Sequence, residues 1–102
     1  MPIPLKRQHY EVLASILKSH RGARREIRWN EFEKAVGVLG FVARRTGAGS
    51  KRTFDSTGPW ACIPFSLHKP KDDILRKGAQ DGLKSLFAAR YGWRSSTFIR
   101  QS

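Results

Sequence analysis

Apolar residues recur every three or four positions near the amino terminus, which predicts an amphipathic helix over residues 5 to about 19. A second, shorter helix is expected to follow. Asn30 would cap it, and Glu33, three positions on, would complete a capping box. Gly40 would end it, because glycine commonly follows the last helical turn.

A third helical pattern covers residues 74–91 near the carboxyl terminus. Gly78 and Gly82 weaken its first half, so we expect the regular helix to begin only around these two glycines. Gly92 would stop the helix, and Trp93 would pack back onto the core. The tail that follows shows no pattern that assigns it to an element.

Between the second and third helices the pattern changes to short runs of strand-forming residues. Three runs are expected to be strands, over residues 41–46, 50–56 and 60–67. The first connection contains Gly47 and Gly49 and the second contains Gly58-Pro59, and both favour a chain reversal. Because the connections are short, we expect a three-stranded antiparallel meander.

Strand residues alternate between two faces, which assigns their side chains to the core or to the surface. Phe54 is the obvious core residue of the second strand, so Lys51 is expected to point away from the core. In the third strand Pro64 cannot donate to a ladder, which predicts an edge strand or a strand end there. Three side chains of that strand are expected to face inward: Ala61, Ile63 and Phe65.

The predicted order is helix, helix, three strands, helix, which is an α+β fold. Without the first helix the order is α-β-β-β-α, the topology of the double-stranded-RNA-binding domain (dsRBD), in which two helices cover one face of a three-stranded antiparallel sheet. The length of 102 residues suits one globular domain. Within it we expect an amino-terminal helix with a basic linker (residues 1–25), a dsRBD-like unit (26–94) and a tail (95–102).

Charge is the feature of the composition that points to a partner. The chain has 20 Lys and Arg against 8 Asp and Glu, a formal net charge of +12. So high a charge on so small a protein favours a polyanionic partner, with nucleic acid ahead of an anionic membrane. No apolar run approaches the ~20 residues of a spanning helix, so we expect no membrane attachment. The arginine-rich segment 20–28 would attract phosphates or lie solvated in a loop.

Cys62 is the only cysteine, so no intrachain disulfide can form. This indicates a reducing compartment, and we expect the cytoplasm, with the nucleus or an organelle as alternatives. Cys62 lies among apolar residues of the third predicted strand, which favours a buried thiol over a nucleophile. We expect no metal site and no cofactor, because the acidic residues do not cluster with histidine at ligand spacing; these are Asp55, Asp72, Asp73 and Asp81.

Three motifs, taken in order, resemble the HicA toxin family, and most closely the HicA-like proteins of fungal genomes. A helix ends in Gly40-Phe41, within the string IRWNEFEKAVGVLGF. Gly49-Ser50 opens the second strand, within GSKRTF, and a turn with histidine follows the third strand, within IPFSLHKP. A last helix ends in FAARYGW, so the resemblance spans residues 26–93 and leaves the first helix as an addition.

The resemblance implies a small basic endoribonuclease of a toxin–antitoxin pair, an mRNA interferase that an inhibitor protein holds inactive. In bacterial members the catalytic histidine directly follows the Gly-Ser pair. The residue in that position is Lys51 in this chain. The departure bears on the ribonuclease activity and leaves the expected fold unchanged.

Metal-independent RNA cleavage needs a base, an acid and cations that stabilise the charge on the phosphorane. Lys51, crowded by neighbouring arginines, would act as the base or would only hold a phosphate. His68 is the candidate acid or base near the sheet, since His9 and His20 belong to the region of the first helix. The alternative is that Lys51 and His68 are ordinary surface side chains without a catalytic role.

Basic and polar residues around the first strand connection and before the last helix are the expected phosphate contacts: Arg44, Arg45, Ser50, Lys51, Arg52, Lys69 and Lys71. Two other functions fit the same residues. One is a non-catalytic module that binds RNA or DNA by shape. The other is a protein-interaction domain whose charge meets an acidic, antitoxin-like partner.

Overall fold

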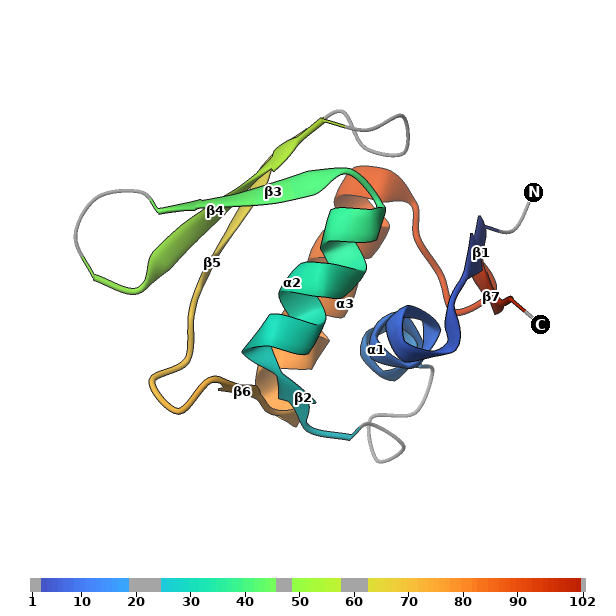
Figure 1. Cartoon of the computed structure of the whole chain (residues 1–102), viewed down its shortest axis with the longest axis horizontal. Helices are drawn as coiled ribbons and strands as arrows, with labels where there is room; N and C mark the ends of the chain where they lie inside the picture. The colour runs from blue at the N-terminus through green and yellow to red at the C-terminus, as the bar shows by residue number, and fades with distance from the viewer. Residues whose placement is uncertain (1–2, 19–24, 46–48, 58–62, 102) are drawn as a thin grey trace.

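The computed structural model describes residues 3–18, 25–45, 49–57 and 63–101. Within these residues the chain is mixed α+β, with three helices and a three-stranded antiparallel sheet (Figure 1). The elements are, in order, β1 (Ile3–Leu5), α1 (Arg7–Leu17), β2 (Ile27–Arg28), α2 (Trp29–Val38), β3 (Phe41–Arg45), β4 (Lys51–Ser56), β5 (Phe65–His68), β6 (Ile74–Leu75), α3 (Lys77–Tyr91) and β7 (Phe98–Arg100).

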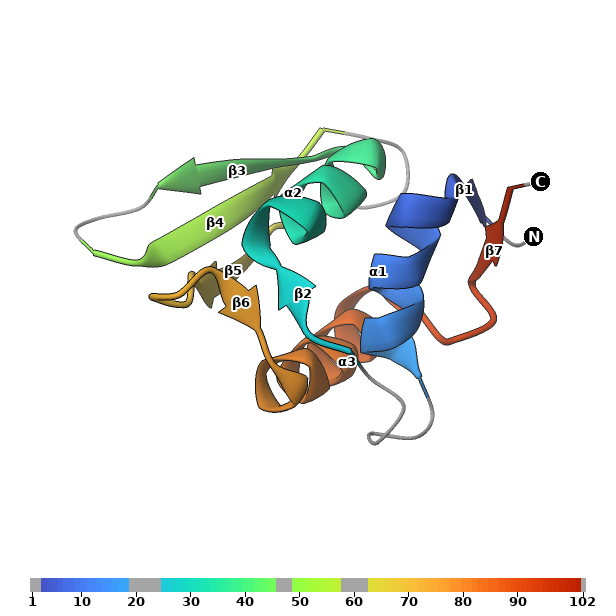
Figure 2. The same cartoon turned by 60° about the horizontal axis from the view of Figure 1, so that its bottom comes forward.

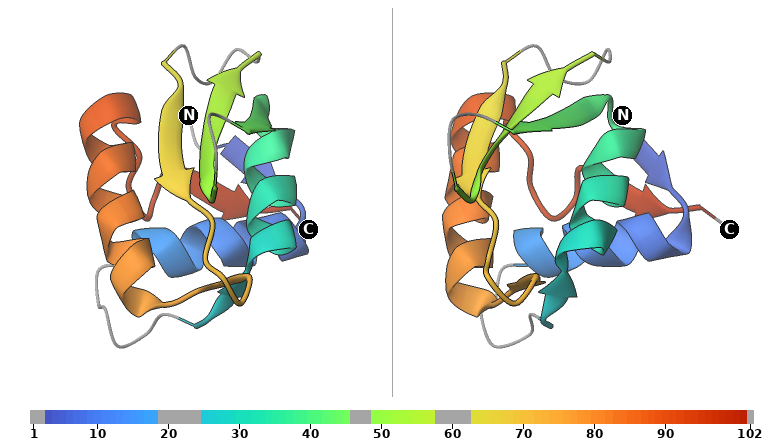
Figure 3. Two further views of the ribbon diagram at one scale, coloured as in Figure 1. Left: turned by 90° about the vertical axis from the view of Figure 1, so that its left-hand side faces the viewer. Right: turned by 60° about the vertical axis from the view of Figure 1, so that its left-hand side comes forward.

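The three-stranded sheet has the order β3-β4-β5, and α2 and α3 lie on one of its faces (Figures 1 and 3). Phe54 and Phe65 are register partners, and their stacked rings lie 4.8 Å apart. Phe32 of α2 packs on Phe54 at 5.5 Å, and Phe87 of α3 packs on Phe65 at 5.3 Å. All four side chains are buried, so the sheet and both helices share one aromatic core.

Helix α1 lies at the opposite end of the molecule from the β3–β4 hairpin (Figures 1 and 2). Its buried face packs on α2 and α3. Beside it, β1 and β7 form a two-stranded parallel sheet, in which the Leu5 carbonyl accepts a hydrogen bond from the Gln101 N–H at 2.7 Å. The expectation that the first helix includes Leu5 is therefore wrong, because this pairing holds Leu5 in a strand. The tail, for which no element was predicted, contains β7 and the buried Phe98.

Helix α2 begins before the predicted cap. Trp29 is its first residue and Arg28 occupies the N-cap position, so Asn30 lies inside the helix. The Arg28 N–H donates to Glu31 Oε1 at 3.0 Å, which gives Glu31 the role expected of Glu33. The Glu33 carboxylate instead accepts a hydrogen bond from the indole N–H of Trp29. At the other end Gly40 directly precedes β3 with φ +96°, which confirms the predicted stop.

The third strand is shorter than predicted. Pro64 offers no N–H to the ladder, and β5 begins directly after it, at Phe65, as an edge strand. Ile63 is 44% exposed, so its predicted inward orientation is wrong, while that of Phe65 is confirmed. The predictions for Gly47, Gly58-Pro59, Ala61, Cys62, His20 and segment 20–24 concern residues outside those that the structure describes.

The third helix, α3, begins at Lys77, just before the two glycines, which therefore lie inside it. Residues 74 and 75 of the predicted helical pattern form β6 and pair with β2 instead. Gly92 ends α3 in a left-handed conformation with φ +68°. Trp93 is buried and packs against Phe87 with tilted rings, whose centroids lie 5.0 Å apart, which confirms its predicted return to the core.

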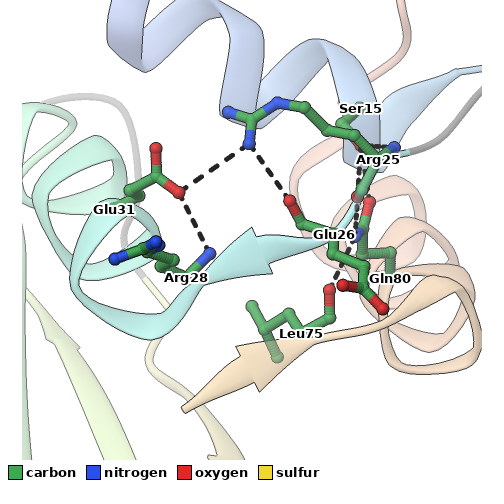
Figure 4. Close-up of polar contacts among 7 residues, drawn as sticks. All are labelled: Ser15, Arg25, Glu26, Arg28, Glu31, Leu75 and Gln80. Carbon is green, nitrogen blue, oxygen red and sulfur yellow. Dashed lines mark hydrogen bonds and ion pairs between the residues drawn. The ribbon is translucent and has the colours of Figure 1, made fainter.

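A buried polar network joins α1, the segment before β2, and α3 (Figure 4). Gln80 Nε2 donates to the carbonyl oxygens of Arg25 at 2.6 Å and Leu75 at 2.9 Å. The Ser15 hydroxyl donates to Gln80 Oε1 at 2.7 Å and accepts the Arg25 N–H at 3.1 Å. Gln80 is fully buried, and every polar atom of its carboxamide has a hydrogen-bond partner in this network.

Replacing Gln80 by leucine should destabilise the protein with little change in volume. The change removes the donor to the buried Leu75 carbonyl and to the partly buried Arg25 carbonyl, and the acceptor for Ser15, and we expect the free energy of unfolding to fall by about 2 kcal/mol or more. Urea unfolding followed by tryptophan fluorescence measures it. Ser85→Ala, at an exposed position of the same helix, is the control and should stay within about 0.5 kcal/mol. Equal effects of the two changes would contradict a role for the network.

Candidate nucleic-acid interface

One face of the three-stranded sheet is covered by the helices, and the other is open. Phe54 and Phe65 are buried against the helices, and every second residue along each strand faces the same way as they do. The alternate residues face away from the helices, and the register aligns them in rows across the sheet. This open face carries Val42, Arg44, Lys51, Thr53, Asp55, Ser66 and His68, with Val42 55% exposed.

Lys51 and His68 are register partners at one end of the open face. The next pair along the ladder is hydrogen-bonded, since the Lys69 N–H donates to the Ser50 carbonyl at 2.8 Å. In an antiparallel ladder such pairs alternate with non-hydrogen-bonded ones, whose side chains lie closer, with Cβ atoms about 4.5–5.5 Å apart. Lys51 and His68 form a pair of this closer kind, and both are exposed to solvent.

Ser50 holds the imidazole of His68 from the neighbouring turn. Its Oγ lies 3.3 Å from His68 Nδ1, and the ring tautomer decides which of the two donates. Gly49, with φ +90°, makes the turn that brings Ser50 to this position. The contact fixes the Nδ1 side of the ring and leaves Nε2 available, because no partner for Nε2 occurs among the described residues.

A row of hydroxyl groups lies next to the Lys51–His68 pair. Thr53 and Ser66 are register partners, and their hydroxyl oxygens are 3.0 Å apart. Neither was predicted as a site residue. Alternation within β4 puts Thr53 on the same face as Lys51, so that part of the signal was present in the sequence. Ser66 joins them only through the register of β5, which the sequence does not specify.

Carboxylates hold two of the predicted phosphate contacts. Arg44 Nε lies 2.7 Å from Asp55 Oδ2, and this hydrogen bond raises the pKa of Arg44 and lowers the pKa of Asp55. Asp55 therefore stays ionised through the neutral range, and the pair weakens only as the pH falls through that lowered pKa. Lys69 Nζ lies 3.1 Å from Asp73 Oδ1. Neither Arg44 nor Lys69 is a fully available cation.

The tip of the β3–β4 hairpin supplies further cations. Arg45 and Arg52 are register partners there, on the face that the helices cover farther along the sheet. The hairpin extends past both helices (Figure 1). Arg45 is exposed there, and Arg52 is half-buried. Arg52 Nη1 donates to the carbonyls of Gly49 at 3.1 Å and Lys51 at 3.2 Å. Lys71 is exposed in the turn that follows β5.

The arrangement combines an imidazole, an ammonium group and several guanidinium groups within one sheet and its turns. In the part of the chain that the structure describes, no carboxylate pairs with Arg45, Lys51, Arg52 or Lys71. The described residues also contain no group of three or more metal-ligating side chains. His9 lies elsewhere, on α1, where burial and then Lys6 and Lys34 lower its pKa.

No described helix is both long and apolar enough to cross a membrane. Comparison with models of protein families, with curated proteins and with solved structures gave no match. The case for a function therefore depends on the side chains of the open face and on the hairpin tip beside it.

Proposed function

We propose that this protein binds RNA across the open face of β3-β4-β5 and cleaves it without a metal ion, as a HicA-like mRNA interferase. The observation that carries the proposal is the close cross-strand pair of Lys51 and His68, with the Ser50 hydroxyl 3.3 Å from the imidazole. Arg45 and Arg52 at the hairpin tip and Lys71 in the turn after β5 lie on the same or adjoining elements, and none of them has a carboxylate partner among the described residues. A phosphate of the RNA backbone would lie over the Lys51–His68 pair.

Two features support a likeness to the dsRBD fold and to the HicA family. Apart from the two-residue β6 before α3, the order α2-β3-β4-β5-α3 with both helices on one face agrees with the topology expected for that fold. Bacterial members of the family have a histidine directly after Gly-Ser, where this chain has Lys51. His68 stands across the ladder from that position and contacts Ser50, so the Gly-Ser turn still adjoins an imidazole. A cytoplasmic location, where mRNA is abundant, belongs to the same proposal.

The chemistry divides between the two side chains. Neutral His68 takes the proton of a 2′-hydroxyl through Nε2, while Ser50 holds Nδ1. The 2′-oxygen then bonds to phosphorus and the bond from phosphorus to the 5′-oxygen breaks. The Lys51 ammonium stabilises the charge on the phosphorane and donates a proton to the departing 5′-oxygen. The products are a 2′,3′-cyclic phosphate and a 5′-hydroxyl.

A second candidate function is a non-catalytic RNA- or DNA-binding module. It is favoured by the exposure of Lys51 and His68, which lie on an open sheet face instead of in a water-excluding pocket. Lysine and arginine on such a face bind phosphates by charge and shape. An acidic, antitoxin-like protein would bind the same cations, and as an inhibitor it would cover Lys51 and His68.

Loss of either member of the pair should abolish cleavage with modest effects on binding. General acid–base catalysis typically contributes at least ~100-fold, so Lys51→Ala and His68→Ala should each slow cleavage of labelled single-stranded RNA by about that factor or more. Gel analysis would measure the rate, and treatment with acid and phosphatase would identify the cyclic phosphate end. Lys34→Ala and His9→Gln, on α2 and α1, are the matched controls.

Three results distinguish the candidate functions. Cleavage that both controls retain and both site variants lose supports the enzyme. Intact RNA with a clear mobility shift supports the binding module and removes the catalytic roles of Lys51 and His68. If the protein neither cleaves nor binds RNA, the RNA proposal is wrong and the acidic protein partner is the remaining candidate.

Neutralising Asp55 should strengthen RNA binding. Asp55→Asn removes a negative charge from the open face and releases Arg44 for a phosphate. One added phosphate contact raises affinity about fivefold near 0.1 M salt and steepens the salt dependence by about 0.7. Fluorescence anisotropy at several salt concentrations measures both. Glu11→Gln makes the same charge change beside Arg7 on α1, and should alter neither quantity; an equal gain in both variants would show that only net charge matters.

A further inference from the structure

A cleft of about 440 Å³ opens where the start of α2 faces the connection between β5 and β6. Its volume is within the range of sites that hold small organic ligands. Lys69 joins it to the open face, because its N–H donates to the Ser50 carbonyl while its ammonium group lies against Asp73 in the cleft. The lining residues are Arg28, Trp29, Asn30, Lys69, Asp72, Asp73 and Ile74.

The lining mixes charges, which sets the cleft apart from the phosphate-binding surface. Asp72 and Asp73 present carboxylates, which would repel a phosphate. Arg28 and Lys69 add hydrogen-bond donors to the lining, and Ile74 adds an apolar residue. A ligand that suits this lining is uncharged and able both to donate and to accept hydrogen bonds. A nucleobase has these properties.

The two carboxylates differ in what they can offer a ligand. Asp72 bonds to Arg76 at 2.6 Å and accepts the Ile74 N–H at 3.3 Å, so both of its oxygens are engaged. The Asp73 side chain is 62% exposed, and only its Oδ1 has a partner among the described residues, Lys69 Nζ at 3.1 Å. Asp73 is thus the carboxylate that can accept further hydrogen bonds.

The backbone of Asp73 is held in place on both sides. Its carbonyl accepts the Trp29 N–H at 2.8 Å, and its own N–H donates to Pro70 at 3.1 Å. Its φ of +60° is a left-handed conformation that aspartate and asparagine tolerate better than most residues. The carboxylate therefore projects from a fixed turn, with an ammonium group beside one of its oxygens.

We propose that this cleft binds a guanine of the same single-stranded RNA, next to the phosphate that lies over Lys51 and His68; this rests on the proposed function. Guanine alone among the four bases presents two adjacent donors, N1–H and N2–H, on its Watson–Crick edge, and they match the two oxygens of Asp73. Its O6 follows on the same edge and accepts from Lys69, which already lies against Asp73 Oδ1.

The test compares three fluorescent RNA octamers: oligouridine, the same octamer with one central guanosine, and the same with one central adenosine. Binding is measured by anisotropy at fixed salt with the full chain carrying His68→Ala, which prevents cleavage. We expect the guanosine octamer to bind at least about fivefold more tightly than the other two, the range of one bidentate base contact. Asp73→Asn keeps the turn and exchanges one acceptor for a donor, so it should remove this preference. Asp81→Asn, on α3 and outside the cleft lining, makes the same charge change and should retain it.

The outcomes separate this inference from the function on which it rests. Tight binding of all three octamers without a preference overturns the guanine site and leaves RNA binding intact. A guanosine preference that survives Asp73→Asn overturns the assignment to this cleft. An equal gain for all octamers on Asp73→Asn would show that the carboxylate only repels phosphates. If no octamer binds, both proposals fall.

Discussion

One aromatic pair sets the register of β4 against β5. Phe54 and Phe65 stack at 4.8 Å between the two helices that cover the sheet. Because side chains alternate with a period of two, the same register places Lys51 opposite His68 on the other face. A slip of one residue would expose a buried phenylalanine and would also separate the two polar side chains. Packing of the core therefore assembles the candidate site.

The charge of the protein is organised by its few carboxylates. Asp55 and Asp73 each hold one cation beside the sheet, and so fix the positions of Arg44 and Lys69. Around the sheet, cations without such partners among the described residues lie at the hairpin tip, at the Lys51–His68 pair and in the turn after β5, and others lie on the helices and the tail. A strand of RNA that follows the cations around the sheet would pass from the hairpin tip to the start of α2. The net charge alone would not distinguish this path from any other surface.

Hydrophobic patterning predicted the three helices and the opposite orientations of Phe54 and Lys51, because each depends on local periodicity. The short connections between the strands predicted the order β3-β4-β5. The sequence could not predict that His68 faces Lys51, since this depends on the register of β4 against β5, which the packing of Phe54 on Phe65 sets in the folded protein. The short strands β1 and β7 were not predicted for a related reason. A strand of three residues carries little pattern, and each of the two pairs with a segment far away in the sequence. The cap of α2 was misplaced because Asn30 has the better capping side chain, yet pairing of β2 with β6 fixes the chain up to Arg28 and starts the helix there.

The most direct measurement is a cross-strand disulfide between positions 51 and 68, made in a Cys62→Ser background. A non-hydrogen-bonded pair has Cα atoms about 4.5 Å apart, within the range that a disulfide spans. Mild oxidation of Lys51→Cys/His68→Cys should give an intrachain disulfide, detected by mass spectrometry of its peptides. Arg52→Cys/His68→Cys places the two thiols on opposite faces and should remain reduced. Efficient oxidation of the second variant and not the first would contradict the register on which the candidate site depends.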